Sequence, residues 1–178
     1  MRSRYDNHYE KKCIEEWAQY VSKNTWNTRA DLTLKPYLKC WTKSGYSKVI
    51  KTTFQEASKN TKWFLHRLNS IVYRNQYRRH NVALKCLVSF EDKKIIKSKN
   101  SKGVYEVLDV NPHIHILFER PGAMLLAEFR TSIIRSWSRS KLGWDINEVS
   151  EVTSQPASIV YNSKLNIGAV DVENTRMK

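Results

Sequence analysis

The stretch VNPHIHILFE, residues 110–119, limits the possible fold more than any other part of the sequence, because its side chains alternate in character. Successive side chains of a β-strand point to opposite faces of the sheet. The two isoleucines and Phe118 are therefore expected to face a hydrophobic core, while His113 and His115 project together from the opposite face. The stretch predicts a strand with one buried face and two adjacent imidazoles on the other.

Apolar periodicity along the rest of the chain predicts a mixed α+β fold. Apolar residues recur at helical spacing in three long segments, and a proline opens a fourth helical segment at its first turn. The helical segments cover residues 8–23, about 47–80 (as one helix or as two separated near 59–62), about 123–140 and 156–166. Alternating or strongly apolar segments that favour strands cover residues 32–34, 82–91, 103–119 and 144–152.

The order of these segments predicts the fold class. After the N-terminal helix the order is strand, helix, strand, strand, helix, strand and helix, which is the split βαβ, ferredoxin-like pattern with an added final helix. We expect an α+β fold in which helices pack on a central antiparallel sheet of about five strands. At 178 residues the chain is long enough for one domain with a hydrophobic core.

The charge of the chain favours a polyanionic partner. Lysine and arginine number 31 against 17 aspartate and glutamate residues, which gives a formal net charge of +14. Nucleic acid is the simplest partner of this kind. The alternative, that the lysines only form a solvated surface, stays open on charge alone.

The cysteines and the apolar runs bear on the cellular compartment. Cys13, Cys40 and Cys86 show no CxxC spacing, so we expect a reducing compartment and neither a zinc ribbon nor a disulfide framework. The first residues, MRSRYDNHYEKK, contain no apolar signal region, and no apolar run approaches the roughly 18 residues that span a bilayer. A cytoplasmic protein without a membrane partner is therefore expected.

A hairpin between the second and third expected strands would bring a carboxylate to the two histidines. If the chain turns near residues 100–103, residues face one another when their numbers add up to about 203, which places Glu91 near His113. Two imidazoles and one carboxylate suit Mn²⁺ or Mg²⁺ and leave positions open for water or a phosphate oxygen. The alternatives are hydrogen-bonded surface histidines and an edge glutamate that pairs with a lysine, since the register of the hairpin is open.

The final expected helix contains Tyr161 and Lys164, which are three residues apart and therefore share a helix face. A phenol, whose pKa is about 10 in water, is a nucleophile near neutral pH only if a cation stabilises its phenolate. Lys164 could supply that cation or stabilise charge on a phosphate under attack. The alternative is a tyrosine and a lysine that only lie on the surface.

Three short motifs, ADLTLKP, PHIHILFE and YNSK, occur in the same order as the motifs of HUH endonucleases. The chain resembles the single-tyrosine rolling-circle replication initiator (Rep) proteins of that superfamily over about residues 30–167. The resemblance implies a helical extension over 1–25, a catalytic domain over 26–170 and a tail over 171–178. Two features depart from the family pattern. Leu165 follows the lysine where many members have an aromatic residue, and the hairpin before the histidines is longer than usual.

The resemblance also implies an activity. Glu91, His113 and His115 would hold a divalent ion, Mn²⁺ or Mg²⁺, that polarises the scissile phosphate of single-stranded DNA. Tyr161, assisted by Lys164, would attack that phosphate and form a covalent 5′-phosphotyrosine, and the free 3′ end would prime replication of a plasmid or virus before the strand is rejoined. The chain contains no GxxxxGK[ST] motif, so we expect it to act at a replication origin with the helicase and polymerase of a host, most simply a prokaryotic cell.

Basic and aromatic side chains are candidates for contacts with DNA. The candidates for phosphate contacts are Arg78, Arg79, Lys97, Lys99 and Lys102. The tryptophans that could stack on bases are Trp26, Trp41 and Trp144. The tryptophans expected in the core, because they lie on or beside apolar stripes, are Trp17, Trp63 and Trp137.

Two alternatives to a replication initiator stay open. A small single-tyrosine HUH transposase or a relaxase uses the same chemistry, but relaxases usually carry three clustered histidines, and such transposases usually have glutamine where Lys164 stands. A ferredoxin-like nucleic-acid-binding module without catalysis is the alternative from another class. It predicts that Tyr161→Phe leaves every activity intact.

Overall fold

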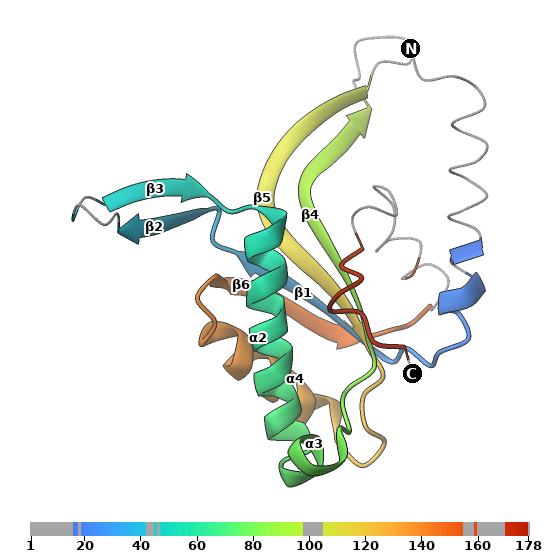
Figure 1. Ribbon diagram of the computed structural model, residues 1–178. Helices are drawn as coiled ribbons and strands as arrows, with labels where there is room; N and C mark the ends of the chain where they lie inside the picture. The colour runs from blue at the N-terminus through green and yellow to red at the C-terminus, as the bar shows by residue number, and fades with distance from the viewer. Residues whose placement is uncertain are drawn as a thin grey trace.

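The computed structural model describes residues 16–17, 19–41, 45, 47–97, 105–154, 159 and 170–177. Figure 1 shows the arrangement of its strands and helices. These elements are β1 (Thr28–Leu34), β2 (Tyr37–Trp41), β3 (Ser47–Lys51), α2 (Phe54–Val72), α3 (Asn75–His80), β4 (Cys86–Lys97), β5 (Tyr105–Phe118), α4 (Leu126–Ser138) and β6 (Gly143–Glu151).

Four strands form the central antiparallel sheet, in the order β4-β5-β1-β6. Strands β2 and β3 pair with each other in a separate sheet. Helix α2 connects β1 to β4 with β5 lying between them, and α4 connects β5 to β6 with β1 lying between them, which is the split βαβ arrangement. The α+β, ferredoxin-like class is therefore confirmed. Within the described residues the central sheet has four strands, where about five were expected.

One face of the central sheet packs against α2 and α4 and forms the main core. The helices contribute Phe64 from α2 and Phe129 from α4, and both side chains are fully buried. Ile114, Ile116 and Phe118 of β5 lie in the same cluster, as the alternation in the sequence predicted. The two histidines that alternate with them are consequently on the opposite face of the sheet.

That opposite face carries a second, smaller apolar cluster. Leu87 of β4 and Leu117 of β5 are buried there with Trp26, Ile159 and Val170. Leu117 is two residues from His115 on β5, so the cluster and the histidines share one face. The second cluster therefore brings a residue of the C-terminal part of the chain, Ile159, onto the histidine face.

The region around 47–80 differs from the helix expected there. Residues Ser47–Lys51 form β3, because they pair with β2, and this long-range pairing overrides an apolar spacing that also fits a helix. Helix α2 starts after Thr53, whose hydroxyl accepts a hydrogen bond from the backbone N–H of Glu56, while the Glu56 carboxylate accepts one from the backbone N–H of Thr53. At Arg74, where φ is +50°, the chain leaves α2 and enters α3.

Strand β4 extends beyond the bounds expected from the sequence. It continues to Lys97, six residues beyond the strand end expected at residue 91. The register with β5 shifts between Glu91 and Lys93, which is a bulge beside the candidate site. On the other edge of β4, Val170 and Arg176 form antiparallel bridges that the sequence did not predict.

The two ends of the chain are described in part. Residues 16–17 and 19–21 are helical, in the region where a helix over 8–23 was expected, and Ile159 is helical within the final helix expected over 156–166. The other residues of those two predictions lie outside the described residues. In the part of the chain that the structure covers, no helix has the combination of length and apolar character needed to cross a membrane.

Candidate metal centre

Strands β4 and β5 bring one carboxylate and two imidazoles to the same face of the sheet. In their antiparallel register Glu91 lies opposite His113, and Ser89 lies opposite His115. The first pair confirms the register expected for a hairpin that turns near residues 100–103. Since His113 and His115 are two residues apart on one strand, they project to the same face.

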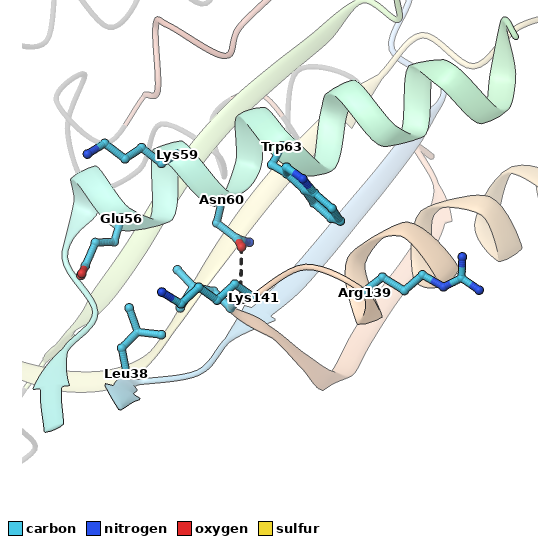
Figure 2. A pocket seen from close by; sticks show the side chains of 8 residues that line it. Leu38, Glu56, Lys59, Asn60, Trp63, Arg139 and Lys141 are labelled. Carbon is cyan, nitrogen blue, oxygen red and sulfur yellow. Dashed lines mark hydrogen bonds between the residues drawn. The ribbon is translucent and has the colours of Figure 1, made fainter. Parts of the chain in front are cut away.

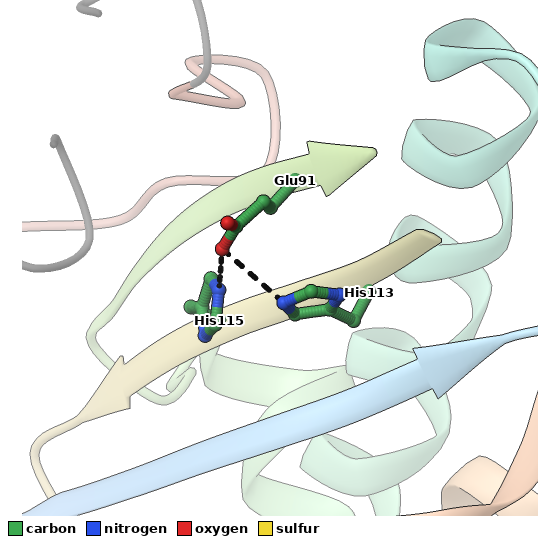
Figure 3. Close-up of side chains that lie close together, drawn as sticks. All are labelled: Glu91, His113 and His115. Atoms are coloured by element: carbon green, nitrogen blue, oxygen red, sulfur yellow. Dashed lines mark hydrogen bonds and ion pairs between the residues drawn. The ribbon is translucent and has the colours of Figure 1, made fainter. Parts of the chain in front are cut away.

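One carboxylate oxygen contacts both imidazoles (Figure 3). Oε2 of Glu91 lies 2.8 Å from Nε2 of His115 and 3.2 Å from Nε2 of His113. Ligand atoms from the three residues all lie within 4.8 Å of one another. Glu91 and His115 are buried, whereas the His113 side chain is 25% exposed, so solvent or a substrate can reach the cluster from the side of His113.

The other nitrogen of each imidazole is held by a separate oxygen. Nδ1 of His113 lies 2.8 Å from the backbone carbonyl oxygen of Asn111, and Nδ1 of His115 lies 2.5 Å from Oδ1 of Asp31. When each Nδ1 donates to its oxygen, both Nε2 atoms are presented to the space beside Glu91. Metal-binding histidines are usually oriented in this way by a carbonyl or carboxylate.

Asp31 lies beside this cluster, and its role was not predicted from the sequence. It lies on β1 directly opposite His115, and its carboxylate also accepts hydrogen bonds from Arg29. Asp31 lies within the ADLTLKP motif, where it alternates with buried Ala30 and Leu32, so a polar face of β1 was detectable. The contact between Asp31 and His115 depends on the register between β1 and β5. No local sequence pattern predicts that register.

The carboxylates change the protonation of the buried imidazole. Burial alone would lower the pKa of His115, but hydrogen bonds and charge from Asp31 and Glu91 outweigh it and raise that pKa above the ordinary histidine value. Burial would likewise raise the pKa of Asp31, and His115 and Arg29 more than offset it, so the pKa of Asp31 is lowered. Without a metal, the two carboxylates thus favour the protonated form of His115.

The two distances from the Glu91 oxygen to the imidazole nitrogens are close to those between ligands of a divalent ion. Adjacent ligands of an octahedral ion with bonds of about 2.1 Å lie about 3.0 Å apart, close to the 2.8 and 3.2 Å found here. Two imidazole nitrogens and a carboxylate form a mixed donor set, and three ligands leave coordination positions open. The structure therefore contains a largely buried Glu/His/His group that could bind a metal ion.

Replacing Asp31 by asparagine is expected to lower the affinity for Mn²⁺ by about 10- to 100-fold, because the amide holds Nδ1 of His115 more weakly and removes a negative charge. Isothermal titration with Mn²⁺ measures the effect. Asp145→Asn, an exposed aspartate of β6, is the matched control and should bind Mn²⁺ as the unmodified chain does. Equal affinities in the two variants would show that Asp31 does not position the imidazole.

Mn²⁺ binding is expected to weaken as the pH falls, because the ion displaces a proton from His115. The raised pKa of His115 means that this competition begins at a higher pH than for an ordinary histidine. In the metal-free chain, the raised pKa of His115 instead stabilises the fold at low pH. This contribution to the free energy of unfolding is complete below about pH 6.5 and is lost as the pH rises through the folded-state pKa of His115. Titrations with Mn²⁺ from about pH 5.5 to about pH 8.5 test this; an affinity that does not vary with pH would contradict it.

The remaining predicted residues divide into those that the structure describes and those that it does not. Tyr161, Lys164, Lys99 and Lys102 lie outside the described residues. Arg78 and Arg79 are exposed on α3, and Lys97 is the last residue of β4. Helix α3 and the far end of β4 lie at opposite ends of the molecule in Figure 1. Among the described candidates, Arg78 and Arg79 therefore lie on a different part of the molecule from Lys97.

Two of the predictions for tryptophan side chains are wrong. Trp26 is 1% exposed and its indole N–H donates to the carbonyl of Val21, so it cannot stack on a base. Trp63, expected in the core, is 46% exposed, because it lies beside the buried stripe of α2 rather than on it. The prediction for Trp137 is confirmed, since it is buried, and Trp144 is 37% exposed.

Comparison of the chain with protein-family models, with curated proteins and with solved structures found no match in any of the three. The fold and the Glu/His/His geometry are consequently the observations on which a function can be based.

Proposed function

We propose that the chain is a metal-dependent, site-specific single-stranded DNA endonuclease and strand transferase of the HUH type, which initiates rolling-circle replication. The observation that carries this proposal is the cluster of Glu91, His113 and His115, in which two anchored imidazoles and a carboxylate converge on one point of a rigid sheet. A net charge of +14 supports a nucleic acid as the substrate.

The residues of the cluster would hold a divalent ion at the partly exposed side of the sheet. When bound, that ion would supply Lewis-acid polarisation of the scissile phosphate and a template for its orientation. Asp31 and the Asn111 carbonyl would keep both imidazoles in the tautomer that binds metal. The exposure of His113 would leave room for a phosphate oxygen to approach.

Tyr161 is the proposed nucleophile. Its phenolate oxygen would form a bond to phosphorus as the bond between phosphorus and the 3′ oxygen breaks, and the released 3′ oxygen would take up a proton. Lys164 would stabilise the phenolate. The new phosphodiester to tyrosine retains the bond energy, so a second strand end could later reverse the step. Support for this part comes from Ile159, which precedes Tyr161 by two residues and packs with Leu87 and Leu117 on the histidine face.

The test is covalent capture from a random pool of single-stranded DNA in the presence of Mn²⁺ or Mg²⁺. The proposal predicts a protein–DNA adduct that survives denaturing electrophoresis, forms only with a divalent ion and is enriched for one sequence. Digestion of the adduct should leave a peptide that contains Tyr161 on the 5′ phosphate. If the chain binds the strand and the ion but no sequence yields an adduct, the chain is a binding module without catalysis.

A further inference from the structure

A second candidate site lies on the helical side of the molecule, away from the histidines. A cavity of about 450 Å³ opens between β2, α2 and the turn that joins α4 to β6. Leu38, Trp63 and Leu142 provide apolar walls, and Figure 2 shows the side chains that surround them. The volume falls in the range of pockets that bind small organic ligands. None of the residues that line this cavity belongs to the metal centre.

The side of the cavity formed by the α4–β6 turn is held firmly against α2. The buried side chain of Asn60 donates to Oγ of Ser140 and accepts from the backbone N–H of Leu142. Within the turn, the backbone N–H of Gly143 donates to Oγ of Ser140. A Cβ atom at Gly143 would lie 2.2 Å from the carbonyl oxygen of Trp137, so the turn is closely packed as well as hydrogen-bonded. The cavity is therefore formed in advance of any ligand.

The rim of the cavity is positively charged. Lys59 from α2 and Arg139 and Lys141 from the fixed turn line it, and each is exposed. Among the residues that the structure describes, none of these three cations forms an ion pair. The carboxylate of Glu56 also lines the cavity, but it accepts two hydrogen bonds from Thr53 at the start of α2. An anion would consequently meet three cations and one engaged carboxylate.

The aromatic wall of the cavity is oriented and accessible. Trp63 is 46% exposed, and its indole projects from α2 toward the turn that carries Arg139 (Figure 2). The guanidinium of Arg67 lies 5.3 Å from the centre of the indole ring and steadies it. An exposed, oriented tryptophan beside a group of cations is the combination with which proteins bind the bases and phosphates of a single strand.

We propose that this cavity binds one base and its neighbouring phosphate of a single nucleic-acid strand, with the base against Trp63 and the phosphate against Arg139 and Lys141. A strand is favoured over a free nucleotide because the cavity is open to solvent on its charged rim, and because the whole chain carries a charge of +14. The site lies on the α2 and α4 side of the sheet, so it would hold a part of the strand away from the metal centre.

Equilibrium binding of a fluorescent oligothymidylate, measured in EDTA, tests the proposal without the metal centre. Trp63→Ala is expected to weaken binding about tenfold or more, while Trp63→Phe retains most of the affinity. The double variant Arg139→Ala/Lys141→Ala removes the contacts to one phosphate, so it should weaken binding and reduce the slope of log affinity against log salt by about 0.7. The matched control, Arg130→Ala/Arg135→Ala, removes two exposed cations of α4 outside the cavity.

Three outcomes decide the matter. Losses in the two cavity variants that exceed the control by several-fold, with unchanged melting temperatures, support the proposal. Losses no larger than the control overturn it. If free thymidine monophosphate saturates a Trp63-dependent fluorescence change without displacing the labelled strand, the cavity serves a nucleotide and not a strand. Because EDTA removes divalent ions, the result does not depend on whether the metal centre is catalytic.

Discussion

Tyr161→Phe is expected to eliminate the covalent protein–DNA adduct completely while it leaves the affinity for single-stranded DNA within about twofold of the unmodified chain. The substitution removes one oxygen, which is the proposed attacking atom, and keeps the aromatic ring. Without that oxygen no bond to phosphorus can form at this position. The measurement is electrophoresis of the denatured reaction with a DNA substrate selected in the capture experiment, next to binding of the same substrate in EDTA.

The control for this substitution is the same change at a tyrosine outside the proposed site. Tyr37 is 60% exposed on β2, outside the histidine cluster, and Tyr37→Phe should form the adduct at the normal rate. An adduct that persists in Tyr161→Phe, and that maps to a different residue, would show that the nucleophile was assigned wrongly even though the metal centre is active. Adduct loss in both variants would point to a general effect on the fold.

The second large effect is expected from the histidine pair. His113→Ala/His115→Ala should reduce the rate of cleavage by on the order of 10³-fold or more, since loss of metal polarisation raises the barrier by several kcal/mol. DNA binding in EDTA should change little, because neither imidazole is proposed to contact the strand. Cleavage assays with Mn²⁺ and binding assays without it separate these two expectations.

In that experiment, a loss of cleavage caused by unfolding must be distinguished from a loss caused by the missing metal ligands. Removal of His115 leaves the buried carboxylate of Glu91 and the partly buried carboxylate of Asp31 without their shared partner, which is destabilising. His113→Ala alone avoids this problem, because His113 is partly exposed, and it should also reduce cleavage strongly. His66→Ala/His80→Ala, in which two exposed histidines are removed, is the matched control. Equal loss of cleavage and DNA binding in the folded His113→Ala variant would mean that the pair is structural.

Much of the fold could be predicted from local pattern because the local signals and the tertiary contacts agree. The alternation in PHIHILFE separated Ile114 and Ile116 from the histidines, and the structure places the two sets on opposite faces. The order of strands and helices was sufficient for the ferredoxin-like class. The position of Glu91 followed from counting residues along a hairpin, which works because antiparallel pairing proceeds in fixed steps.

The features that were not predicted depend on contacts between distant residues. Strand β3 was read as helix because Ile50 fits an apolar helical spacing, and only pairing with β2 reveals the strand. Asp31 is 84 residues from His115, and its role follows from strand register alone. Trp63 lies on α2 next to the buried stripe, and only its position around the helix axis separates it from the core residues. The sequence pattern alone did not fix that position closely enough to show that Trp63 is exposed.

The most direct test of the account is the position of Mn²⁺ in crystals of the chain grown with that ion, located by its anomalous scattering. We expect a peak about 2.0–2.3 Å from Nε2 of His113, from Nε2 of His115 and from a carboxylate oxygen of Glu91. Nδ1 of His115 should remain bonded to Asp31. An anomalous map with no peak at these three residues, in crystals where His115 still bridges Asp31 and Glu91, would contradict the assignment of this cluster as a metal centre.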